Sequence, residues 1–153
     1  MMALGISSKQ GALMSYLALS ESKSVTLAIG DISGALSSGA YLTMTLEHDE
    51  ISIAGSGTST LTLPSGHYAV SGIVGADMNN TSSDLFDFSW ELDSSLIGAQ
   101  GGRQPNGKVG SDAAEAVFSV ETTSSLRLKV TAITGSPTIL STHSQVFIRR
   151  VSL

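Results

Sequence analysis

From Val25 onward, apolar and polar residues alternate in short stretches, which is the pattern of β-strands with one buried face. Residues 84–92 give the clearest example, because one face would carry four large side chains, Phe86, Phe88, Trp90 and Leu92. Segments rich in Gly, Pro, Asp and Ser separate the stretches and favour turns. We therefore predict an all-β, antiparallel sandwich or barrel of about nine or ten strands, expected over residues 25–29, 41–47, 51–53, 58–63, 67–78, 84–92, 114–120, 126–131 and 143–151.

The segments between these strands are predicted to be turns and loops. Pro64-Ser65-Gly66 and residues 122–125 have turn composition, and the Gly-rich residues 100–110 are expected to form a long loop. Residues 76–83 form a second polar loop. If the protein binds a receptor, loops of this kind are where its contacts are expected, and the candidate residues are Asn79, Asn80, Arg103 and Lys108.

The first 24 residues differ from the rest, because they contain small residues and Met but no alternation of period two. Leu13, Tyr16 and Leu17 have helical spacing, although Gly11 and the short length would make an isolated helix marginal. We interpret residues 1–24 as an arm that docks on a partner and residues 25–153 as the β domain. The alternative is an unstructured terminus. The apolar residues through which the arm would bind are Met1, Met2, Leu4, Ile6, Leu13, Met14, Tyr16 and Leu17.

The last predicted strand, residues 143–151, has apolar residues and an Arg on each of its two faces. A strand with one solvated face should alternate more cleanly. We therefore predict that one face packs on the core and the other meets a second subunit, through Phe147, Arg149 and Val151. The alternative is a solvated strand with an exposed Phe, which is common in soluble proteins.

Composition narrows the possible functions. The chain has 153 residues, enough for one domain with a real core, and a formal charge of −5. Only 14% of its residues are charged, while 27 Ser and 13 Thr supply the polar surface. The few scattered cations do not form a nucleic-acid-binding stripe. No apolar run reaches the roughly 20 residues that span a membrane, and the N-terminus does not resemble a signal peptide. We expect neither nucleic acid nor membrane as a partner.

Catalytic chemistry has little support in the sequence. The three His residues, His48, His67 and His143, stand in no nucleophile-elbow, zinc-protease or phosphate-loop motif. The absence of Cys removes thiolate chemistry and disulfides. We expect no enzymatic activity and no cofactor.

One loop carries several hard oxygen donors of the kind that bind calcium. However, Ser82 stands where a calcium loop requires Gly, so a polar turn is favoured over a metal site. The donors concerned are Asp77, Asn79, Thr81 and Asp84.

The segment Leu61–Val70 has the pattern L-x-L-P-x-G-x-Y-x-V, and a long strand, a polar loop and the run FDFSWEL follow it. This order resembles the jelly-roll domains of the tumour-necrosis-factor and complement-head type, especially small viral versions. The resemblance covers about residues 40–153. Two features depart from it, namely Arg149-Arg150 in the closing strand and the N-terminal arm.

The resemblance implies a compact homotrimer. In bacteriophages, domains of this type serve as capsid decoration (cement) proteins, head fibres and fibre tips. Because the chain starts with Met and ends at residue 153, we expect a free-standing decoration trimer on the capsid exterior, bound to the major capsid protein through its arms. The alternative is a receptor-binding fibre tip or adhesin that recognises a host surface glycan.

Overall fold

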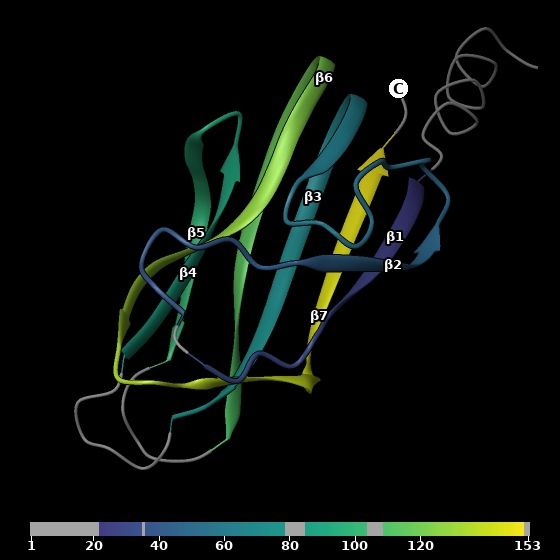
Figure 1. Ribbon diagram of the computed structural model, residues 1–153. Helices are drawn as coiled ribbons and strands as arrows, with labels where there is room; N and C mark the ends of the chain where they lie inside the picture. Colours follow the sequence, from purple (N-terminus) through teal and green to yellow (C-terminus); the bar gives the residue numbers. More distant parts are fainter. Residues whose placement is uncertain (1–21, 35, 79–84, 104–108, 152–153) are drawn as a thin grey trace, which may run out of the picture.

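The computed structural model describes residues 22–34, 36–78, 85–103 and 109–151. These residues form one antiparallel sheet in the order β2-β1-β7-β3-β6-β4-β5, which curls so that its two halves face each other (Figure 1). The strands of this sheet are β1 (Ser22–Ile29), β2 (Met44–Asp49), β3 (Leu61–Asp77), β4 (Leu85–Leu92), β5 (Ser95–Arg103), β6 (Gly110–Thr134) and β7 (Thr138–Val151).

The long strand β6 joins the two layers of the sandwich. Its residues 110–120 pair with β3, and its residues 126–134 pair with β4. One layer therefore contains β1, with β2 beside it, β7, most of β3 and the first half of β6. The other contains β4, β5 and the second half of β6, with which the start of β3 pairs, and β5 also pairs with the first half of β6 at Glu115. The alternating strands bury their apolar faces between the layers.

Trp90 of β4 lies at the centre of this core and is fully buried, as its place in the alternation predicts. Its indole Nε1 donates a hydrogen bond to the carbonyl oxygen of Ala114, at 2.9 Å. Gly72 of β3 faces the ring so closely that a Cβ atom there would lie 2.9 Å from Trp90 Cζ2. Glycine at position 72 thus lets the two layers meet around the largest side chain of the chain.

Seven strands lie among the described residues, fewer than predicted, because two predicted turns lie inside strands and residues 51–53 form no strand, while β5 is additional. Pro64 and Gly66 form an irregularity within β3, where the register against β6 shifts. Residues 122–125 continue β6, because their β-compatible Thr and Ser residues pair with the start of β3. Both long strands stay unbroken where the sequence has turn-like composition.

The segment after β4 also differs from the prediction. Asp93 and Ser94 have φ angles of 45° and 72° and form a two-residue hairpin turn of the kind that matches strand twist. The strand β5 follows, so residues 100–103 belong to the sheet and not to a loop. Gly101 packs against Phe88, since a Cβ atom there would lie 2.5 Å from the ring. Close packing, and not loop flexibility, explains this glycine.

The two ends of the sandwich carry different parts of the chain. The start of β1 and the end of β7 lie together, because Ser22 pairs with Val151. The end of β3, the start of β6 and the starts of β4 and β7 lie at the opposite end (Figure 1). The sheet begins at Ser22, three residues earlier than the predicted domain boundary. None of the described segments forms a helix of the length and apolar character needed to cross a bilayer.

Candidate functional site

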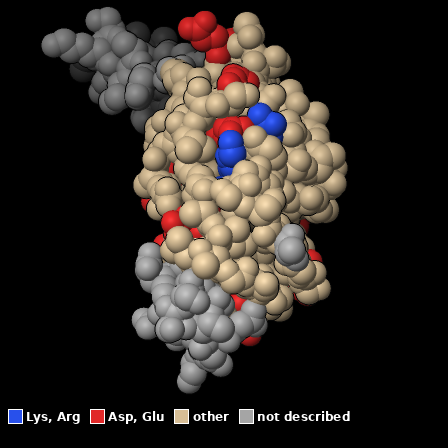
Figure 2. Space-filling view, turned by 60° about the vertical axis from the view of Figure 1, so that its left-hand side comes forward, with Lys and Arg blue, Asp and Glu red and all other residues tan. Residues whose placement is uncertain are grey.

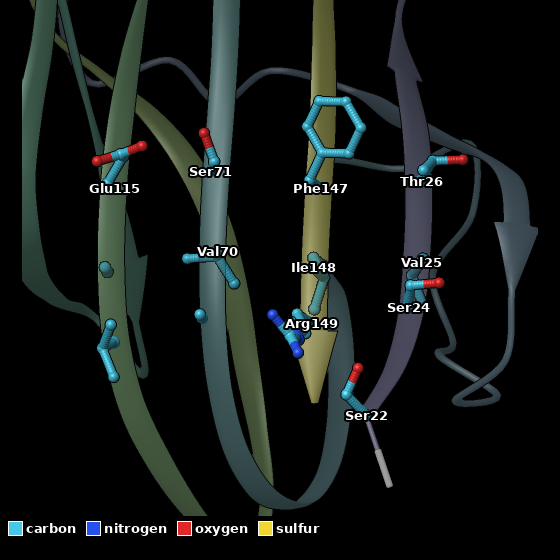
Figure 3. Close-up of a pocket in the computed structure, with 13 residues that line it drawn as sticks. Ser22, Ser24, Val25, Thr26, Val70, Ser71, Glu115, Phe147, Ile148 and Arg149 are labelled. Atoms are coloured by element: carbon cyan, nitrogen blue, oxygen red, sulfur yellow. The ribbon is translucent and has the colours of Figure 1, made fainter. Parts of the chain in front are cut away.

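A shallow groove of about 570 Å³ lies on the outer surface of the layer formed by β1, β7, β3 and the first half of β6 (Figure 3). We call this outer surface the groove face. Strand register places its side chains in two adjacent rows across four strands. One row consists of Thr26, Phe147, Ser71 and Glu115, and the next of Ser24, Arg149, Ala69 and Val117.

The groove face exposes apolar side chains on a background of small ones. Val117 is 85% exposed and Phe147 is 41% exposed. Their neighbours in the rows are mostly the small residues Ser, Thr and Ala, which keep the surface shallow. An exposed apolar area with a polar border is typical of a surface that binds another protein.

Two charged side chains, Arg149 and Glu115, line the groove among these small and apolar residues. They lie on opposite sides of β3 and two residues apart along the strand direction. That arrangement separates their Cα atoms by roughly 10 Å across the sheet and about 7 Å along it. Neither forms an ion pair or a side-chain hydrogen bond with another described residue.

The sequence prediction for β7 agrees with this geometry. Phe147 and Arg149 lie on the outer side of the strand, while Val146 and Ile148 are buried on the inner side. Val151 is half-buried at the end of the same outer face. That these three residues contact a second subunit stays a prediction.

Sequence reasoning missed the contributions of β3 and β6 to the groove face. Alternation around Ala116 and Val120 already implied that Glu115 and Val117 point outward. It did not show that β6 and β7 lie on either side of β3, because that neighbourhood depends on the topology of the sheet.

Several other predicted contact residues lie outside the described part of the chain. They are the arm residues from Met1 to Leu17, and Asn79, Asn80 and Lys108. Arg103 is the last residue of β5. It lies near the end of the sandwich opposite Ser22, because it pairs with Phe86 near the start of β4.

A second charged group, which we call the Glu91 cluster, lies on the outer surface of β4 and β6. Glu91 is only 2% exposed. Its carboxylate accepts contacts from Arg127 Nη2 and Lys129 Nζ, both at 2.8 Å, and from the Tyr41 hydroxyl at 3.0 Å. The Arg127 guanidinium also stacks on the Tyr41 ring, 4.4 Å from its centroid. In Figure 2, basic side chains gather beside acidic ones on this side of the molecule.

The Glu91 cluster stabilises the ionised carboxylate. The hydrogen bond from Lys129 is the largest cause that lowers the pKa of Glu91, burial opposes it, and Tyr41 and the two cationic charges lower it further. The same hydrogen bond raises the pKa of Lys129. The cluster attaches the segment around Tyr41 to β6, which indicates a structural role.

The three His residues have separate, ordinary partners. His48 and Glu50 are exposed and lie 3.6 Å apart. His67 Nδ1 lies 2.7 Å from Ser119 Oγ, and His143 Nδ1 lies 2.9 Å from Thr142 Oγ1. Within the described residues, no three acidic or His side chains are arranged to hold a metal ion. Of the four calcium-loop donors, only Asp77 belongs to that part of the chain, as the last residue of β3.

Neither the known family models nor the curated proteins include a match to this sequence. Solved structures do match it. Murine APRIL superposes with a TM-score of 0.61 and 12% identity, covering 85% of this chain and 99% of the other. Eiger TNF from S. frugiperda gives 0.61 and 12%, covering 85% and 91%. The globular domain of zebrafish complement 1qA gives 0.56 and 10%, covering 84% and 94%.

The chain has a TNF/C1q-like jelly-roll fold. This confirms the fold that the segment around Leu61–Val70 and the order of the strands indicated. At 10–12% identity the likeness concerns the fold alone. The expected bacteriophage origin and capsid role therefore stay predictions about the jelly roll.

Proposed function

We propose that this jelly-roll protein is a structural component without catalytic activity, which associates with copies of itself through the groove face. We further propose that the assembly is a homotrimer that decorates the exterior of a bacteriophage capsid. The part of the predicted arm that precedes β1, residues 1–21, would bind the major capsid protein and so stabilise the head.

The observation that carries this proposal is the groove face itself. Its exposed Val117 and Phe147 would be covered on association, which removes apolar surface from water. The surrounding Ser, Thr and Ala side chains lose little conformational entropy on burial and permit close approach. A second copy is a suitable occupant, because the groove face contains both members of a complementary charged pair, Arg149 and Glu115.

Three-fold closure suits the layout of the groove face. In a ring, one side of a surface meets the opposite side of the neighbouring copy, so the two contacting patches differ. Here β6 lies on one side and β7 and β1 lie on the other, and the two sides carry different side chains. The resemblance found in the sequence implies the same number of copies.

The place where the arm joins the domain supports a decoration role. Ser22 begins β1 at one end of the sandwich, and β1 borders the groove. In a trimer with a three-fold axis along the sandwich, three arms would leave from the same end. Three linked contacts can exceed single-site binding by about 10²–10⁴ where the geometry allows simultaneous binding.

Sedimentation velocity tests the assembly. We expect the full chain to sediment as a trimer and Val117→Ser/Phe147→Ser to shift strongly toward monomer. Leu96→Ser is the matched control, because Leu96 is 56% exposed on β5 and outside the groove. If the double variant associates as well as the wild type, the groove face is not the interface.

Antibody labelling of the source particle in the electron microscope tests the decoration role. Label spread over the head would support it, and we then expect deletion of residues 1–20 to abolish binding to undecorated capsids. Label confined to the tail or fibre ends would contradict it and favour the glycan-binding alternative.

A further inference from the structure

We infer that Arg149 of one copy forms an ion pair with Glu115 of the next copy, and that this pair determines how the copies align. The inference rests on the proposed self-association and goes further, because it names the two residues that decide specificity. It follows from the position of the only two charged side chains among the described residues that line the groove.

These two side chains are placed to meet a neighbour and not each other. Strand β3 separates β7, which carries Arg149, from β6, which carries Glu115, and neither side chain forms an ion pair with another described residue. Each lies two residues from an exposed apolar side chain on its own strand, Arg149 from Phe147 on β7 and Glu115 from Val117 on β6. Across the strands, the register places Arg149 in the row of Val117. Glu115 lies in the row of Phe147 (Figure 3).

Association would desolvate both charges, because they border the apolar side chains that must be covered. A buried charge without a partner is costly, so an association that covers the groove face needs a partner for each charge. A copy that presents its β6 side to the β7 side of a neighbour supplies Glu115 to Arg149. Each copy then gives one Glu115 and receives one, which leaves neither charge unpaired in a closed ring.

The pair would contribute more to alignment than to overall affinity. The chain carries a formal charge of −5, so copies repel one another at long range. An attraction between Arg149 and Glu115 opposes this repulsion in one alignment, and like charges meet in others. Complementary charges of this kind mainly give specificity.

A charge-swap experiment on the full chain tests the inference. Arg149→Glu and Glu115→Arg are each expected to weaken self-association by at least about tenfold, since like charges then face each other at every contact. The double swap R149E/E115R restores the pair with opposite polarity and should recover most of the association. Lys23→Glu is the matched control, because Lys23 is exposed on β1 but does not line the groove.

Sedimentation velocity measures association, and circular dichroism with thermal unfolding verifies that each variant is folded. Two results would overturn the ion pair while the self-association stands: single swaps that associate like the wild type, or a double swap that stays as weak as the singles. A wild-type chain that is monomeric at all concentrations would overturn the proposed assembly as well.

Mixing the two single variants determines whether the pair lies in a three-fold ring. An unlike contact between R149E and E115R copies is fully complementary, whereas any like contact is repulsive. A ring of three always contains at least one like contact, so the mixture should associate less well than the double swap. Recovery equal to the double swap would contradict the three-fold arrangement and indicate a two-fold dimer.

Discussion

The two groups of charged residues on the outer surfaces of the sandwich have opposite surroundings. In the Glu91 cluster, the buried carboxylate has three partners from its own chain, namely Arg127, Lys129 and Tyr41. On the groove face, Arg149 and Glu115 stand apart with no such partner among the described residues.

The two layers therefore differ in whether the charges on their outer surfaces have partners within the same copy. In the Glu91 cluster, the chain's own segment around Tyr41 pairs with β6 along its backbone, and the Tyr41 side chain joins Glu91 on the outer surface. On the groove face no other described residue forms an ion pair with Arg149 or Glu115, and both charges are exposed beside exposed apolar side chains. The Glu91 cluster therefore stabilises the fold, whereas Arg149 and Glu115 are available for association.

The largest expected effect on the fold comes from Glu91→Gln. This substitution removes the charge that neutralises Arg127 and Lys129, which are 24% and 28% exposed. We expect a loss of about 2–3 kcal/mol in the free energy of unfolding, below the range for fully buried pairs because the cations stay partly solvated. Urea unfolding measures it. Glu121→Gln, at an exposed position of β6, is the control. A change under about 0.5 kcal/mol would contradict the structural role of the Glu91 cluster.

Tyr41→Phe should have a smaller effect, about 0.5–1.5 kcal/mol, because it removes one hydrogen bond to a carboxylate and keeps the ring beneath Arg127. Measured with Glu91→Gln in a double-mutant cycle, the two effects should not add. Additivity would show that Tyr41 and Glu91 act independently, against the description of one cluster.

Stability should also fall in acid, with a contribution from Glu91. Because the folded protein lowers the pKa of Glu91, its contribution is fully present above the ordinary Glu pKa and is lost as pH falls through the folded value. Unfolding measured in urea between about pH 6 and pH 3 should show this loss. In Glu91→Gln the decline should be shallower. An equal decline in both proteins would assign the effect to other carboxylates, such as Asp93, whose pKa is also lowered.

The smallest expected effect is that of salt, which should change self-association through Arg149 and Glu115 more than the stability that the Glu91 cluster provides. Raising ionic strength from about 0.05 to 0.5 M shortens the screening length severalfold. Over this range of salt, we expect the change in the association constant to differ a fewfold between the wild type and Arg149→Ala. The free energy of unfolding of the monomeric Val117→Ser/Phe147→Ser variant should change little, because Glu91 is buried. Identical salt dependence of association in wild type and Arg149→Ala would argue against a role for Arg149.

The sequence predicted much of the fold, because alternation reports directly which side chains a strand buries. It placed Trp90 inside and separated Phe147 from Ile148 on β7. It failed where composition and sheet context disagree, at Pro64-Ser65-Gly66 and at residues 100–103, since neighbouring strands keep turn-like residues in the ladder. The groove face could not be predicted from the sequence, because only the strand order places Arg149 and Glu115 on the two strands that flank β3.

The measurement that tests the account most directly is the molar mass of the full chain by sedimentation equilibrium over a range of concentrations. One copy has a mass of 15.7 kDa, so the account predicts a species of about 47 kDa, three times that value. This species should persist at low micromolar concentration and should be lost in Val117→Ser/Phe147→Ser. A mass of 15.7 kDa at every concentration would contradict the claim that the groove face is an interface between copies.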